Sequence, residues 1–165
     1  MNKVVYKLGD DISTDIIYPG RYMATVLPTE TPKFAFDDLR DLNTLLNSKD
    51  SSEEAIIIGG KNFGCGSSRE QAASTLKGHN ITIVARDFAR IFLQNAINLG
   101  LQTVICPDID AETGDELTVE GEKVINHTKG KEFSVIPLPK ARQSIVDAGG
   151  LIPYARKKLL EMHGL

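Results

Sequence analysis

The chain has 165 residues, of which 41% are hydrophobic and 25% charged, a composition that supports a folded core and argues against disorder. Its 19 Lys and Arg against 22 Asp and Glu give a net charge of −3, and without a basic block we expect no nucleic-acid partner. Its apolar runs fall far short of the roughly 20 residues that a membrane span needs, and no signal-peptide core is present, so we expect a cytoplasmic protein without a membrane partner.

The first third of the chain is mostly irregular in pattern. A short strand is predicted over residues 4–8, followed by a loop rich in Asp, Ser and Thr that ends at Pro19. Residues 21–54 are weakly periodic and predict a long excursion with one helical piece around 34–46. Because such a stretch inside a compact domain is usually functional or mobile, we expect a single domain, 1–165, with a mobile loop around 21–54.

From residue 55 the pattern alternates between short apolar runs and helical spacing closed by glycines. The predicted order is strand 55–58, helix 67–77, strand 81–85, helix 87–99 and strand 101–105. This alternation implies parallel strands joined by right-handed crossovers.

After Pro107 the texture changes to short β segments separated by glycines, and then to helical spacing. The predicted strands are 116–119, 122–126 and 132–137, and the predicted helices are 140–148 and 151–162. The fold class is therefore α/β, with a parallel βαβαβ core and a small additional β region.

The most informative segment, GGKNFGCGSSREQ over residues 59–71, joins a predicted strand to a predicted helix. Its glycines allow a tight turn and a close approach to a ligand, and the helix start offers unpaired N–H groups that suit an anion. Arg69 adds a planar cation that matches a carboxylate. The other groups of this predicted anion pocket are the backbone of Gly64, Cys65 and Gly66 and the hydroxyls of Ser67 and Ser68.

A purely structural interpretation of the same segment stays open. Ser67-x-x-Glu70 and Ser68-x-x-Gln71 both match the capping box, and glycines at a strand-to-helix turn need no ligand. The spacing matches neither a dinucleotide fingerprint nor a Walker A loop. Cys65 would need helpers to act as a nucleophile, and no histidine stands in a recognisable triad context.

A second polar cluster, GDDISTDIIYPGRY over residues 9–22, follows the first predicted strand. It holds three carboxylates and two hydroxyls, among them Asp15, but lacks the spacing of an EF-hand loop. A loop of Asx-turns with solvated acids is the plainer alternative. The two cysteines of the chain, Cys65 and Cys106, are too few for a cluster or zinc site, so we expect no metal on them, and they suit a reducing compartment.

These two segments, followed by FARIFLQNAINLG over residues 88–100 and AGGL over 148–151, resemble the small subunit of isopropylmalate dehydratase, which has homoaconitase and dimethylmalate dehydratase relatives in the aconitase superfamily. The resemblance covers essentially the whole chain. It implies a three-layer β/β/α fold like the swivelling domain of aconitase. It also implies an iron–sulfur large subunit that supplies a [4Fe–4S] cluster, so that no cofactor resides on this chain.

The resemblance implies hydro-lyase chemistry on a small hydroxy-dicarboxylate or hydroxy-tricarboxylate, and roles for individual residues. Ser67 matches the catalytic serine, whose alkoxide takes the proton from the carbon next to a substrate carboxylate, and Arg69 matches the carboxylate-binding arginine. Asp15 matches an acidic residue near the substrate hydroxyl. Because a capping oxygen is already engaged, we expect Ser68 to cap the helix or the backbone amides to serve the oxyanion, with Ser68 close to the substrate.

In the resembling family, a short loop after Pro-Gly sorts substrates, and it reads YLRT in archaeal-type isopropylmalate enzymes and YLVY in homoaconitases. This chain reads Tyr22-Met23-Ala24-Thr25. Ala24 cannot pair with a carboxylate, and neighbouring Arg21 either compensates or is a solvated loop arginine. A small Ala24 beside an adaptable Met23 would suit a malate with small alkyl groups.

The main prediction is therefore the small subunit of a heterodimeric or heterotetrameric 3-isopropylmalate dehydratase, a leucine-biosynthesis enzyme. The alternatives are a subunit that acts on dimethylmalate or methylmalate, a homoaconitase subunit and, from another class, a non-catalytic anion-binding module.

Overall fold

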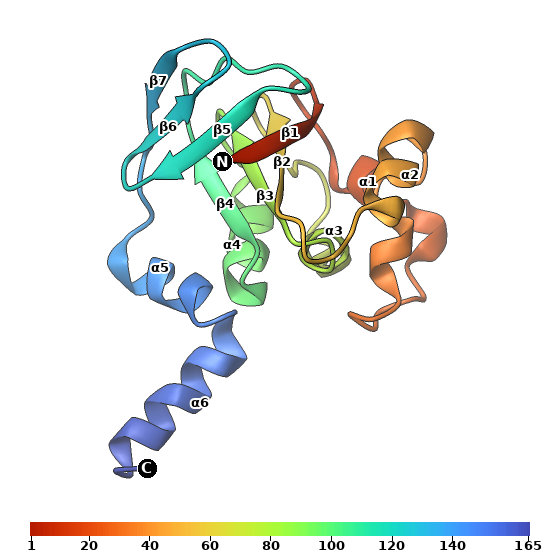
Figure 1. Ribbon diagram of the computed structural model, residues 1–165. Helices are drawn as coiled ribbons and strands as arrows, with labels where there is room; N and C mark the ends of the chain where they lie inside the picture. The colour runs from red at the N-terminus through yellow and green to blue at the C-terminus, as the bar shows by residue number, and fades with distance from the viewer.

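The computed structural model describes residues 1–165 and is built on one seven-stranded sheet of order β4-β3-β2-β1-β5-β6-β7 (Figure 1). Its strands are β1 (Asn2–Lys7), β2 (Ala55–Gly59), β3 (Ile81–Ala85), β4 (Gln102–Ile105), β5 (Glu116–Glu120), β6 (Lys123–Asn126) and β7 (Lys131–Ser134). Strands β1 to β4 are parallel, and β5 to β7 continue the sheet in antiparallel pairing from β1.

Six α-helices and two short 3-10 helices complete the fold. They are α1 (Thr14–Ile17), η1 (Gly20–Tyr22), η2 (Thr31–Phe34), α2 (Arg40–Ser48), α3 (Glu70–Lys77), α4 (Arg90–Leu99), α5 (Lys140–Asp147) and α6 (Leu151–Met162). The succession β2-α3-β3-α4-β4 confirms the predicted βαβαβ core, and β5 to β7 are the predicted additional β region.

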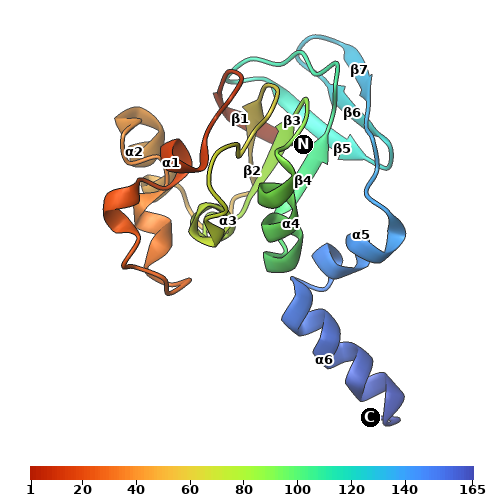
Figure 2. The same cartoon turned by 180° about the vertical axis from the view of Figure 1, so that it is seen from behind.

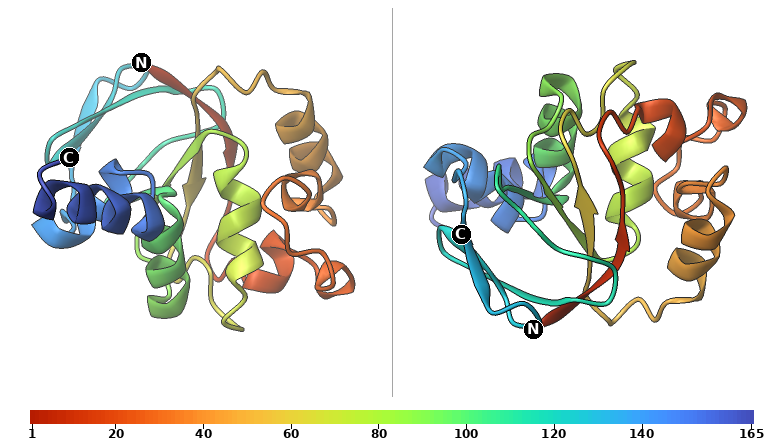
Figure 3. Two further views of the ribbon diagram at one scale, coloured as in Figure 1. Left: turned by 90° about the horizontal axis from the view of Figure 1, so that it is seen from below. Right: turned by 90° about the horizontal axis from the view of Figure 1, so that it is seen from above.

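The sheet has an apolar cluster on each face, because β2, which lies between β1 and β3, presents apolar residues to both faces. Every residue of β2 is buried. The larger cluster joins the sheet to α2, α3 and α4, and includes Leu42, Leu76 and Phe92. The smaller cluster joins β1 to β3 with β5 and β6, and includes Leu117 and Val124. Figure 3 shows β5 to β7 curving over the face opposite α3 and α4, which gives the β/β/α layering.

Two helices begin three residues later than predicted. Helix α3 begins at Glu70, and neither Ser67 nor Ser68 caps it; Arg69 stands at its N-cap without a side-chain capping bond. Helix α4 begins at Arg90 with Ala89 at its N-cap. The residues before each helix are instead used in loop-to-loop hydrogen bonds, and the Asp87 carboxylate accepts the N–H of Asn62.

The segment 21–54 contains more structure than the single helical piece predicted for it. The helical piece predicted around 34–46 corresponds to α2 at 40–48, and the segment also holds most of η1 and all of η2. These 3-10 helices were not predicted, because each is only one turn long. Ala35, Phe36 and Leu46 from this segment lie in the main core. Its exposed apolar side chains are confined to the stretch that contains Met23, Val26 and Leu27.

Helix α6 extends away from the rest of the molecule, as Figure 2 shows from the side opposite to Figure 1. None of its residues is buried, and its exposed apolar side chains include Ile152, Leu159 and Met162. No helix in the structure has both the length and the apolar character needed to cross a membrane.

Candidate active site

Two loops that leave neighbouring parallel strands form the candidate site. The first loop (residues 8–13) follows β1 and the second loop (residues 60–69) follows β2. Since β1 and β2 are parallel and paired, both loops emerge at the same edge of the sheet. Backbone hydrogen bonds join the two: Gly60 N to Gly9 O at 3.0 Å, Asp11 N to Lys61 O at 2.9 Å, Gly64 N to Ile12 O at 2.7 Å and Thr14 N to Cys65 O at 2.8 Å.

Gly64 and Gly66 give the second loop its shape. Their φ angles are +85° and +99°, a region that residues with a side chain rarely adopt. A Cβ on Gly64 would lie 2.2 Å from the ring of Phe92, whereas one on Gly66 would lie 3.5 Å from Thr14 Oγ1. The prediction that these glycines permit a tight turn is confirmed, and at Gly64 close packing against α4 adds to the requirement.

Ser67 lies exposed on the second loop. Its Oγ is 3.1 Å from Oγ1 of Thr14, a threonine that is almost fully buried at the start of α1. Since Ser67 does not cap α3, the Thr14 hydroxyl is the hydrogen-bond partner of its own hydroxyl. Thr14 was not among the predicted site residues, although it stands one residue before Asp15.

The backbone after Ser67 presents a run of free donors. The N–H groups of residues 67–71 have no acceptor within the chain, and the last two belong to the first turn of α3. Free N–H groups at a helix N-terminus attract negative charge. The backbone amides, rather than a Ser68 cap, are therefore the groups available to an oxyanion.

Arg69 joins the end of the second loop to α1 through its guanidinium. One Nη donates to Asp15 Oδ1 at 2.7 Å and to the carbonyl oxygen of Tyr18 at 3.2 Å. The side chain is only 19% exposed, and its Nε is buried without an acceptor. The guanidinium of Arg69 therefore keeps N–H donors without an acceptor in this chain, as a carboxylate-binding arginine requires.

Asp15 supports Arg69 as its carboxylate partner. The same Oδ1 also accepts the N–H of Gly20 at 3.0 Å. The hydrogen bond from Arg69, followed by that from Gly20, lowers the pKa of Asp15 below its ordinary value of 3.8. Asp15 is thus an anion that orients the arginine at neutral pH.

A surface hollow of about 440 Å³ lies beside Ser67 and is lined by Gly64, Gly66, Ser67, Ala89, Arg90 and Ile91. The last three residues stand at the start of α4, after β3, and were not predicted to belong to the site. Their signal in the sequence is position, because β3 is parallel to β2 and ends at the same sheet edge. A separate hollow of about 380 Å³, around Lys7, Lys61 and Arg86, contains none of the predicted site residues.

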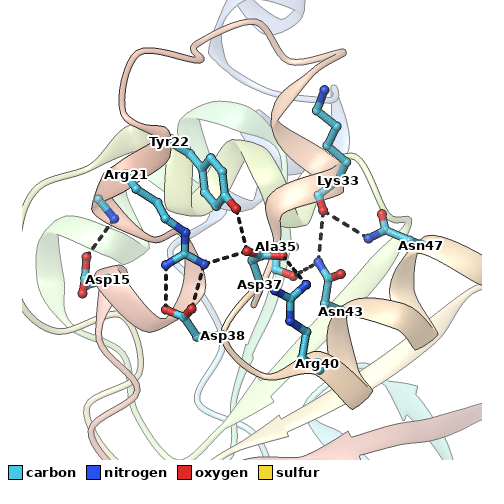
Figure 4. A network of polar contacts seen from close by, with 11 residues as sticks. Asp15, Arg21, Tyr22, Lys33, Ala35, Asp37, Asp38, Arg40, Asn43 and Asn47 are labelled. Atoms are coloured by element: carbon cyan, nitrogen blue, oxygen red, sulfur yellow. Dashed lines mark hydrogen bonds and ion pairs between the residues drawn. The ribbon is translucent and has the colours of Figure 1, made fainter.

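Arg21 does not face the second loop. Its guanidinium donates to Asp37 at 2.6 Å and to Asp38 at 2.7 Å, and the hydroxyl of Tyr22 donates to Asp37 at 2.6 Å (Figure 4). The Tyr22 and Arg21 hydrogen bonds lower the pKa of Asp37, and the aspartates raise the pKa of Arg21. Carboxylates of its own chain thus engage the guanidinium of Arg21, and its role as a replacement for the missing arginine stays a prediction.

Residues 21–25 make up the predicted selectivity segment, and those after Tyr22 lie closer to α3. Gln71, in the first turn of α3, donates from Nε2 to the carbonyl oxygen of Met23 at 3.3 Å. Ala24 is exposed, and Thr25 is half-buried. The segment thus borders the helix whose N-terminus follows Ser67.

The chain's own donors do not fit a metal or an iron–sulfur cluster. No three His, Cys, Asp or Glu side chains group closely enough to hold a metal ion. Cys106 is buried, its Sγ donates to Ser134 O at 3.4 Å, and burial raises the pKa of its thiol to about 11. Cys65, the other cysteine, is half-buried in the second loop.

Fold and site together define an α/β domain that presents a serine, free backbone donors and a carboxylate-anchored arginine at the carboxyl edge of a parallel sheet. Residues 16–108 match the aconitase C-terminal domain. The 3-isopropylmalate dehydratase small subunit of Methanosarcina mazei is 45% identical over 161 residues, with 94% of this chain and 96% of the relative covered. The isopropylmalate/citramalate isomerase small subunit of Methanocaldococcus jannaschii is 42% identical over 163 residues, with 95% and 94% covered.

The crystal structure of 3-isopropylmalate dehydratase (LeuD) from Methanocaldococcus jannaschii superposes with a TM-score of 0.88 at 32% identity, covering 98% of this chain and 96% of that one. The chain belongs to the aconitase-superfamily family of 3-isopropylmalate dehydratase small subunits. The family resemblance and the α/β fold class expected from the sequence are thereby confirmed.

Proposed function

We propose that this chain is the small subunit of a dehydratase that interconverts 2-isopropylmalate and 3-isopropylmalate by loss and return of water. The observation that supports this most directly is the second loop, where the Ser67 hydroxyl, a run of free N–H groups and Arg69 follow one another. The names of the relatives agree with this substrate, and none of those described above is named for dimethylmalate or homoaconitate. A purely anion-binding module gains no support from them.

Each group of the site has a step to perform in this proposal. The unused donors of Arg69 bind a substrate carboxylate, while Asp15 holds the guanidinium in place. Ser67 Oγ, as the alkoxide, takes the proton from the carbon next to that carboxylate. The neighbouring N–H groups and the Thr14 hydroxyl, 3.1 Å away, stabilise the oxyanion.

The partner in this proposal is an iron–sulfur large subunit that works with this chain in the cytoplasm. Because no residues here fit a cluster, the [4Fe–4S] group belongs to that subunit, where it would supply Lewis-acid activation of the substrate hydroxyl. This chain supplies Ser67 as the base, Arg69 as the carboxylate-binding residue, and the selectivity segment.

The test is anaerobic turnover by the reconstituted complex of both subunits with 3-isopropylmalate. Ser67→Ala should lower kcat by a factor of about a thousand or more, the scale at which loss of a catalytic base or nucleophile acts. Ser144→Ala, an exposed serine on remote α5, is the matched control. Unchanged turnover in Ser67→Ala would contradict the catalytic role, and binding without turnover by a cluster-loaded complex would favour the anion-binding module.

We also propose that the chain is one domain with a segment that becomes fixed only with substrate or large subunit. Since residues 35, 36, 42 and 46 lie in the core, and the carbonyl oxygens of Tyr22 and Thr25 accept from a buried hydroxyl of the same chain, we narrow this segment from 21–54 to 26–30. Its amides should exchange hydrogen faster than those of α2 in the chain alone, and should slow in the complex with substrate. Exchange as slow as in the core before assembly would contradict this proposal.

A further inference from the structure

Tyr18 is a buried tyrosine that connects the selectivity segment to Arg69. It follows α1 directly, and its side chain is fully buried. Its ring packs at 6.3 Å from those of Tyr22 and Phe34, which stack on each other at 3.9 Å. A phenylalanine would satisfy this packing, so the hydroxyl needs a separate explanation.

The hydroxyl of Tyr18 reaches the backbone of the selectivity segment at two places. It lies 3.0 Å from the carbonyl oxygen of Tyr22 and 3.0 Å from that of Thr25. These two carbonyls bracket Met23 and Ala24, the residues at which this chain departs from the family's substrate-sorting motif. A buried hydroxyl shared by two carbonyls fixes the separation of those carbonyls.

The backbone of Tyr18 contacts Arg69, the predicted carboxylate-binding residue. Its carbonyl oxygen accepts from Arg69 at 3.2 Å, so one residue touches both the carboxylate-binding arginine and the turn that carries Ala24. A second contact joins the same parts, because Gln71 donates to the Met23 carbonyl. The distance between Arg69 and Ala24 is thus set largely through Tyr18.

We propose that Tyr18 is a positioning residue that fixes the selectivity segment relative to Arg69 and thereby sets the size of alkyl group that the site accepts. This inference rests on the proposed function and deepens it. When Arg69 binds the substrate carboxylate, the alkyl group of the substrate lies at a fixed distance from Arg69. The selectivity segment can distinguish alkyl groups by size only if it is held at that same distance from Arg69. Small displacements suffice, because one methylene changes discrimination by roughly 10-fold or more.

The experiment compares Tyr18→Phe with wild type in the reconstituted complex on two substrates, 3-isopropylmalate and the methyl-substituted citramalate. The expected result is a change of about fivefold or more in the ratio of the two kcat/KM values, carried mainly by KM, because the chemistry at Ser67 is untouched. Tyr6→Phe is the matched control, since the Tyr6 ring packs against the same core and its hydroxyl is outside the site. Equal losses on both substrates, or an unchanged ratio, would overturn the proposal.

A second readout separates this inference from the proposed function. The amide of Thr25 donates to Tyr22 O at 2.9 Å, inside the turn that Tyr18 holds, and its hydrogen exchange can be measured in the full chain without turnover. Tyr18→Phe should speed this exchange about tenfold, and Tyr6→Phe should not. If wild type turns over neither substrate, the proposed function fails while exchange still decides whether Tyr18 holds the segment; unchanged exchange overturns the inference.

Discussion

At the scale of single residues, Gly64 shows how tightly the second loop is specified. A side chain there would meet both an unfavourable φ of +85° and the Phe92 ring 2.2 Å from its Cβ. We expect Gly64→Ala to lower the free energy of unfolding by about 3 kcal/mol or more, summing backbone strain with overpacking. Urea denaturation measures the change.

Gly130 supplies the control for that prediction. Its φ is +64°, and a Cβ there would meet nothing within 4 Å. Gly130→Ala should therefore cost only the backbone term, about 1–2 kcal/mol. Equal losses in the two variants would mean that contact with Phe92 contributes nothing.

The sequence contained the motif glycines and serines, but not their geometry. A capping box is a local pattern, so Ser67 and Ser68 matched it without any knowledge of the loop beside them. The structure places Ser67 next to Thr14, and a contact between residues 53 positions apart has no local signature. Arg21 was ambiguous for the same reason, since Asp37 and Asp38 reach it only after the chain folds back.

At the scale of elements, His79 joins the end of α3 to η2. Its Nε2 lies 2.7 Å from the carbonyl oxygen of Pro32, and burial lowers its pKa below the ordinary 6.5. The unfolded chain therefore takes up a proton at higher pH than the folded one does. Titration of His79 therefore leaves the free energy of unfolding unchanged above about pH 6.5 and lowers it as the pH falls below that value.

We expect His79→Gln, which stays neutral and can still donate to Pro32, to flatten the fall of the urea midpoint between pH 7 and 5. His163→Gln, at an exposed position near the C-terminus, should leave that fall as in wild type. A wild-type slope in both variants would show that another group controls stability in this range.

Elements with a clear apolar pattern were predicted from the sequence, and the 3-10 helices were not. The strands β2 and β3 follow from apolar runs, because burial on both faces leaves a clear pattern, and the helices α3 and α4 follow from helical spacing closed by glycines. The 3-10 helix η2 was not predicted, and it leads into Ala35 and Phe36, which pack in the core. That packing involves residues distant in the sequence, which local propensity does not report.

At the scale of the whole molecule, α6 lies outside the cooperative core. Because none of its residues is buried, removing the chain after Gly150 should shift Tm by only a few degrees. Removing α5 as well, after Pro139, deletes buried Val146 and should lower Tm further. Differential scanning calorimetry distinguishes these outcomes, and an equal large loss in both would place α6 within the cooperative unit.

The hydrogen bonds between the first and second loops also bear on the kinetics of assembly. All of these hydrogen bonds lie within this chain. The loop that carries Ser67 therefore loses its conformational entropy when the subunit folds and not when it binds its partner. Encounter with another subunit can then proceed as docking of a preorganised surface, for which association rate constants of about 10⁵–10⁷ M⁻¹s⁻¹ are ordinary. A slow conformational phase, if assembly has one, would originate in residues 26–30 and not in the loop that carries the serine.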